Sequence, residues 1–151
     1  MAIRKVGHLT EGAAPPIGEA RVRLTSAQLR ALHTAAGAIA LTDAPGAGKL
    51  IVLDDAVATF TPAAASPVAY AGGGPILIQY AATTPLTIAQ FTANTLTGGT
   101  TATTRHIRPA VAQSEPRVGA ALRISTGTAF TAGNGTLEIV VRYRIVDLNV
   151  G

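Results

Sequence analysis

The sequence predicts an all-β domain, a jelly-roll sandwich or barrel of about eight strands with one short N-terminal helix and an extended N-terminal arm. Three observations predict this fold. Over nine residues from Leu137 to Ile145, large apolar side chains at every second position alternate with mostly polar ones, which predicts a half-buried strand over residues 137–147. Short runs rich in Val, Ile and Leu recur along the chain, separated by turns that contain Gly and Pro. The length of 151 residues suits a single domain, and no long repeat interrupts it.

The first 23 residues are expected to form an extended basic arm, and residues 24–151 the folded domain. Residues 1–23 hold three glycines and the pair Pro15-Pro16, and they show no apolar periodicity. The prolines favour a polyproline-like path. Because such a segment buries too little surface to order by itself, we expect it to become fixed on a partner.

One short helix is expected between Leu24 and Leu32. Thr25 suits the N-cap position, and Gln28 follows it at the spacing of a capping box. Leu29 and Leu32 lie three residues apart, so they share one helix face. Gly37 ends the helical tendency, which leaves one or two turns.

The chain from Ala38 onward reads as strands and turns. A long strand is expected over residues 49–60, with a β-bulge near Asp54-Asp55. Residues 43–48 and 72–75 are expected to be turns. Further strands are expected at residues 38–41, 68–70, 76–80, 105–108 and 121–124.

Two other segments carry local signals. Residues 83–104 fit either a short helix over residues 87–93 or a long Thr-rich loop. Asn134-Gly135 is a favoured pair for a type I′ turn, and it precedes the long alternating strand.

Composition narrows the class of protein. The chain has no Cys, so disulfides and thiolate metal sites are excluded. Hydrophobic residues make up 48% and charged residues 13%, which argues against disorder. The net charge of +4 is too small to favour nucleic-acid binding over a role in solubility. No apolar run is long enough to span a bilayer and no secretion signal stands at the N-terminus, so we expect synthesis in the cytoplasm and no membrane partner.

No motif predicts an enzyme, a metal site or a cofactor. Residues 45–50 lack the first Gly and the Ser or Thr of a phosphate-binding loop, and a strand follows them. Asp54 and Asp55 are adjacent, so in a regular strand they point to opposite faces and a structural role is expected. The three histidines have no metal-ligand spacing, and no Ser lies in a nucleophile-elbow setting. Tyr143 lies on the opposite strand face from Arg142 and Arg144, so they form no stacking platform for single-stranded nucleic acid.

Four segments together resemble small virion proteins of tailed bacteriophages. They are residues 45–49 (PGAGK), 69–74 (AYAGGG), 105–109 (RHIRP) and 134–148 (NGTLEIVVRYRIVDL). In order and spacing these are similar to head decoration (cement) proteins and minor structural proteins, over residues 24–148. The resemblance implies a jelly-roll domain on the capsid exterior that forms homotrimers and binds major capsid subunits. It brings no catalytic residues and no cofactor.

Charge placement suggests which residues contact the capsid. Eight basic residues are candidates, in the arm and on two predicted strands: Arg4, Lys5, Arg21, Arg23, Arg105, Arg108, Arg142 and Arg144. Two other classes stay open. One is a tail, baseplate or fibre module with a receptor-binding or carbohydrate-binding role, since jelly rolls also serve as lectins. The other is a cupin-like metal oxygenase, which requires a His-x-His cluster that the sequence lacks.

Overall fold

A computed structural model describes residues 17–109 and 117–149 of the chain. These residues form eight strands and two short helices, α2 (Ser26–Ala31) and α3 (Ala93–Leu96). The strands are β1 (Ile17–Leu24), β2 (Ile39–Ala40), β3 (Lys49–Thr61), β4 (Ile76–Tyr80), β5 (Leu86–Phe91), β6 (Thr103–Ile107), β7 (Leu122–Thr126) and β8 (Thr136–Asp147). Neither helix is long and apolar enough to cross a membrane.

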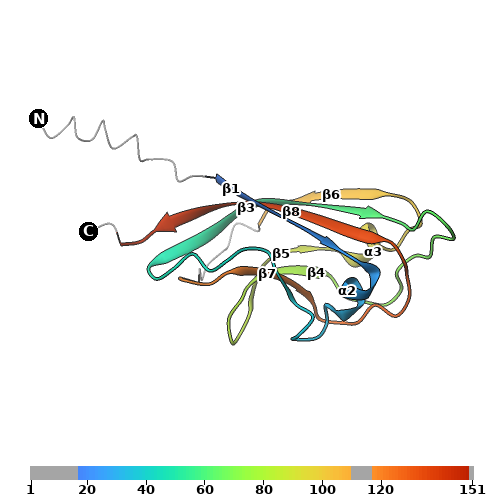
Figure 1. Cartoon of the computed structure of the whole chain (residues 1–151), viewed down its shortest axis with the longest axis horizontal. Coiled ribbons are helices and arrows are strands. Elements are labelled where there is room, and N and C mark those ends of the chain that lie inside the picture. Colours follow the sequence, from blue (N-terminus) through green and yellow to red (C-terminus); the bar gives the residue numbers. More distant parts are fainter. Residues whose placement is uncertain (1–16, 110–116, 150–151) are drawn as a thin grey trace, which may run out of the picture.

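The strands form two four-stranded antiparallel sheets that lie face to face (Figure 1). Sheet A has the order β1-β8-β3-β6, and sheet B has the order β2-β7-β4-β5. The predicted all-β sandwich is therefore confirmed. The first strand begins and the last strand ends at the same end of the sandwich.

The strand pairs are nested about the middle of the chain. The first strand pairs with the eighth, the second with the seventh, the third with the sixth and the fourth with the fifth. Such nesting arises when one long hairpin, with its tip between β4 and β5, wraps over itself into two layers. Two of the connections between the layers carry α2 and α3, whose Leu29 and Leu96 are buried in the core.

Alternating side chains from both sheets fill the space between them. In β8, Leu137, Ile139 and Val141 are fully buried, which confirms the predicted long half-buried strand. The hydroxyl of Tyr80 in sheet B donates a buried hydrogen bond of 2.6 Å to the carbonyl oxygen of Ile51 in sheet A. This bond joins the two layers through the core.

The predicted arm is wrong for its last seven residues, because residues 17–23 belong to β1. Ile17, which is 70% exposed, starts a strand that runs along β8 up to the pair Leu24 and Leu137. The inward positions of this strand include Gly18 and Ala20, whose small side chains gave no apolar alternation in the sequence. The rest of the predicted arm, residues 1–16, lies outside the described residues.

The predicted helix and bulge are both confirmed. Thr25 caps α2, its side chain accepts from the Gln28 amide, and the Gln28 side chain accepts from the Thr25 amide, which completes the capping box. In β3 the pairing with β8 shifts between Leu53 and Asp55, which makes Asp54 the extra residue of a bulge.

Three local predictions are wrong. Residues 68–70 form no strand, because their backbone bonds go to side chains and loops, such as the bond from Tyr70 to the Thr97 carbonyl. Residues 86–91 form strand β5, and the only helical turn of this region follows at residues 93–96. A type I′ turn requires a positive φ at Asn134, and the φ of Asn134 is not positive. The Asn134 side chain instead binds the backbone of Ser66 and Val68.

Candidate functional site

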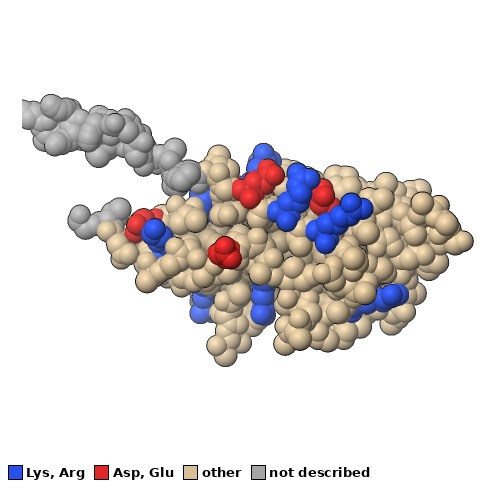
Figure 2. Space-filling model, in the orientation of Figure 1, with Lys and Arg blue, Asp and Glu red and all other residues tan. Residues whose placement is uncertain are grey.

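The outer face of sheet A carries four of the eight basic residues that the sequence suggested as contacts, namely Arg21, Arg23, Arg142 and Arg144. Pairing places Glu19 opposite Arg142 and Arg23 opposite Glu138, so positive and negative side chains stand next to one another across the strands. Figure 2 shows blue and red groups side by side along this part of the surface. The face is therefore an ionic ladder and not a basic patch.

The bulge in β3 is what completes this ladder. In a regular strand Asp54 and Asp55 would point to opposite faces. Because Asp54 is the extra residue, both carboxylates reach arginines of β8 on the outer face. Both carboxylates are bound in ion pairs, which agrees with the structural role that their adjacency predicts.

Asp55 is the most strongly held carboxylate of the ladder. The Nε of Arg142 donates to one of its oxygens at 2.8 Å, and a terminal nitrogen of the same guanidinium donates to the other. The Nε2 of His106 lies 3.3 Å from the second oxygen. The hydrogen bonds from Arg142 lower the pKa of Asp55 below its ordinary value of 3.8, against the opposing effect of burial.

The other arginines of this face are also engaged. Arg144 binds Asp54 at 2.7 Å. Arg21 binds Glu138 at 3.0 Å and lies 3.7 Å from Glu19. Surface ion pairs of this kind contribute little stability one by one, but they neutralise the charge that a partner would meet.

Arg23, also on this face, donates to the hydroxyl of Thr136 at 3.4 Å. Two of the suggested contact residues, Arg4 and Lys5, lie outside the described residues.

Arg105 and Arg108 stand apart from the ladder, on the edge strand β6 and just after it. Arg105 pairs with Ala58 in the register, so it lies on the opposite face of β6 from His106. Both arginines are exposed, and within the described part of the chain no carboxylate lies within ion-pair distance of either. These two arginines are therefore available to an outside partner.

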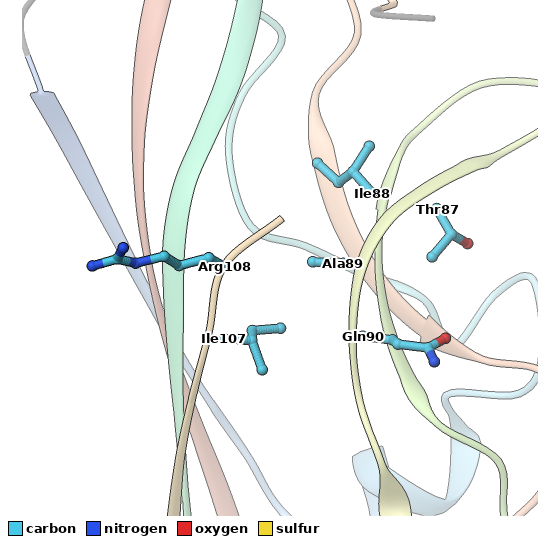
Figure 3. Close-up of a pocket in the computed structure, with 6 residues that line it drawn as sticks. All are labelled: Thr87, Ile88, Ala89, Gln90, Ile107 and Arg108. Atoms are coloured by element: carbon cyan, nitrogen blue, oxygen red, sulfur yellow. The ribbon is translucent and has the colours of Figure 1, made fainter. Parts of the chain in front are cut away.

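A groove of about 380 Å³ runs beside them, between β5 and β6. These are the edge strands of sheets B and A, so the groove follows the open side of the sandwich. In Figure 3, Ile107 and Ala89 point toward each other across it, while Arg108 points away over sheet A. The groove thus has an apolar interior and a cationic rim.

Sequence reasoning missed two features of this site. It did not identify the carboxylates of Glu19 and Glu138 as partners of the arginines, because strand register is needed to bring them together. It also did not find the groove, since residues 87–90 were read as helix or loop. No sequence signal would have revealed either feature without the strand order.

The described residues contain no group of three or more His, Cys, Asp or Glu side chains placed to hold a metal ion. No protein-family model matches the chain, and no curated protein matches its sequence.

Proposed function

We propose that this protein is a structural component of a tailed-phage virion that binds the outside of the head and ties neighbouring major capsid subunits together. The observation that carries the proposal is the nested strand pairing of the two sheets. This strand order supports a jelly roll, an architecture of viral capsid and lectin domains. The motif order of residues 45–148, which resembles head decoration proteins, supports the virion role among the roles of that fold.

The state of the carboxylates also favours a structural role. An acid or base in catalysis must be free to exchange a proton with a substrate. Asp54 and Asp55, the only adjacent carboxylates of the chain, are instead bound by Arg144 and Arg142. Their role is to align β3 with β8 across the bulge.

The capsid contact is best placed at the β5–β6 side of the sandwich. Arg105 and Arg108 are exposed there, and the groove beside them offers apolar surface. An acidic capsid surface would complement these cations. The outer face of sheet A is less suited, since three of its four arginines, Arg21, Arg142 and Arg144, already bind carboxylates of the same chain.

Repetition would make a modest contact effective. A decoration protein that forms homotrimers presents three copies of its contact surface, so binding of the first raises the effective concentration of the others. Binding only the expanded shell would stabilise that state by mass action. Residues 1–16 precede β1 at the edge of sheet A and would extend the contact along a subunit boundary.

Co-sedimentation with purified, undecorated, expanded heads tests the proposal. We expect saturable binding at a fixed number of copies per head. The double variant Arg105→Gln/Arg108→Gln should weaken binding about tenfold or more. Arg21→Gln/Arg23→Gln removes the same charge from the ladder and should bind nearly as the unaltered protein does.

Absence of saturable binding to any expanded head would overturn the proposal. Saturable binding to a glycan array without binding to heads would favour the tail or fibre module instead. Equal losses for the two double variants would keep the virion role but remove the β5–β6 side as the contact surface.

A further inference from the structure

The outer face of sheet B differs in charge from the ladder of sheet A. Alternation places seven side chains of sheet B on that face: Ala40, Leu77, Gln79, Thr87, Gln90, Arg123 and Ser125. Among them Arg123 is the only charged residue. No carboxylate of residues 17–109 or 117–149 lies within ion-pair distance of it. Arg123 therefore carries a positive charge that the described chain leaves uncompensated.

Arg123 lies in a depression of about 200 Å³ on this face. Its floor comes from β4 and β7, with Gln79 and Ser125 beside the arginine. Its wall is the segment between α2 and β2, which includes His33 and Thr34. A cation and several polar groups thus line a space that is large enough for a few water molecules.

The described chain does not satisfy all the hydrogen-bond donors of the Arg123 guanidinium. The Nε is buried and has no hydrogen-bond acceptor. Most buried polar atoms in proteins are hydrogen-bonded, and leaving one without a partner is costly. Gln79 stands directly opposite Arg123 in the register, yet its side-chain oxygen accepts from Ser125 at 2.7 Å. A ligand from outside the described chain would satisfy the guanidinium.

The polar floor is held in place before any ligand arrives. The Ser125 hydroxyl donates to Gln79, and the Gln79 amide nitrogen donates to the Thr87 hydroxyl at 3.0 Å. Gln79 is only 8% exposed, and both of its side-chain bonds are partly buried. A fixed floor lowers the cost of ordering the site on binding.

The wall is equally fixed. The Thr34 hydroxyl donates to the Ala31 carbonyl and accepts from the Gly37 amide, both at 2.9 Å. The Thr126 amide donates to the Leu32 carbonyl, which ties the wall to β7. The Nδ1 of His33 lies 2.9 Å from the Arg30 carbonyl, which can only accept. Nδ1 therefore carries the proton and leaves Nε2 free.

We propose that this depression is a carboxylate-binding site centred on Arg123. A guanidinium presents parallel N–H groups that match the two oxygens of a carboxylate, and a carboxylate in the depression would meet the terminal nitrogens of Arg123, since its Nε is buried. The small volume limits the ligand to a carboxylate on a short stem, either a free small acid or an acidic side chain of a partner. The proposal concerns the chemistry of the depression and does not depend on the role at the phage head.

Titration of ¹⁵N-labelled protein with sodium acetate, followed by NMR, tests the site. Sodium chloride at equal ionic strength is the reference. We expect saturable shifts of the Arg123 Nε–H signal and of the Gln79 and Ser125 amides, with a dissociation constant on the order of 1–10 mM. N-acetyl-glutamate amide as a second probe separates the sources. If it binds as acetate does, the site accepts protein side chains; if only acetate binds, the site takes free small acids.

Variants make the assignment specific. Arg123→Gln should weaken acetate binding about tenfold or more. Arg105→Gln removes an exposed charge elsewhere and should leave the dissociation constant unchanged. Should Arg123→Gln fail to fold, Arg123→Lys keeps the charge but loses the fork, and it should weaken binding less. Shifts that do not saturate, or that chloride reproduces in the unaltered protein, would overturn the proposal.

Discussion

The ring of Tyr143 lies against the backbone of Gly18, on the strand beside it. The two residues face each other in the pairing of β1 with β8. A Cβ atom built on Gly18 would lie 2.6 Å from the Cζ of the ring. The φ angle of Gly18 is not positive, so space alone, and not backbone conformation, demands glycine there. This contact fixes the start of β1 against the sheet.

Gly18→Ala should therefore destabilise the protein although alanine suits a strand better than glycine. The added methyl group must displace the ring of Tyr143, and overpacking of this kind costs about 1–3 kcal/mol. The free energy of unfolding in urea measures the effect. Gly127→Ala is the matched control, because nothing lies within 4 Å of its added Cβ and its φ is not positive.

A second background separates the ring from other causes. With Tyr143→Ala already present, Gly18→Ala should become neutral or slightly stabilising, because the obstacle is gone. Equal losses in both backgrounds would show that the ring is not what excludes a side chain at this position.

Asp55 should contribute a stability that is lost in acid. Its pKa is lowered in the folded protein, chiefly by hydrogen bonds from Arg142, while the ordinary value is 3.8. The contribution is therefore fully present above about pH 3.8 and disappears as the pH falls through the lower folded value. Asp55→Asn should lower the Tm by roughly 1–3 °C at neutral pH and by less in acid.

Thermal melts at pH 7 and pH 2.5 measure this difference. Asp43→Asn is the control, since Asp43 is exposed and makes no ion pair with another described residue. A difference between Asp55→Asn and the unaltered protein that stayed constant over this range would contradict the assignment.

The position of β1 predicts where the N-terminus can be shortened. The pairing of β1 with β8 begins at Ile17, so removing residues 2–16 should change the Tm by less than about 2 °C. Removing residues 2–20 also deletes the first half of β1 and exposes β8, and it should lower the Tm by several degrees. Equal melting temperatures for the two truncations would show that the first half of β1 adds no stability.

Sequence periodicity predicted the fold where one strand face is apolar and the other polar. β8 was found almost in full because large apolar side chains recur at every second position from Leu137 to Ile145. β1 has the same alternation in burial, but Gly18 and Ala20 occupy two of its four inward positions and carry little apolar signal. A period-two pattern is visible only where the inward side chains are large.

The candidate site was less accessible to sequence reasoning. Arg142 and Asp55 lie 87 positions apart in the chain, and only the register of β3 and β8 brings them together. The bulge was predicted near Asp54-Asp55, yet its consequence, two carboxylates on one face, depends on which partner strand lies beside it. The same limit applies to Arg123, since the depression around it joins three separate segments.

Tyr80 offers the sharpest test of how the two sheets are joined. Its hydroxyl is buried and donates to the Ile51 carbonyl across the core, so Tyr80→Phe leaves a buried acceptor without its donor. We expect a loss of about 1–3 kcal/mol in the free energy of unfolding with little change of fold.

Burial also raises the pKa of Tyr80 above its ordinary value of 10.0. The folded state therefore favours the protonated hydroxyl of Tyr80. The stability that this hydroxyl contributes is fully present below about pH 10 and is lost as the pH rises through its pKa in the folded protein.

Unfolding measured at pH 7 and pH 11 distinguishes the two effects. Tyr143→Phe is the control, because the Tyr143 side chain is only half-buried and lies opposite Gly18, near the start of β1. Tyr80→Phe should have a lower free energy of unfolding than this control at pH 7. The difference should narrow at pH 11, because Tyr80 then ionises in the unfolded chain and the proteins that keep Tyr80 lose stability. A gap that is absent at pH 7 would mean that the hydroxyl bond across the core does not hold the sheets together.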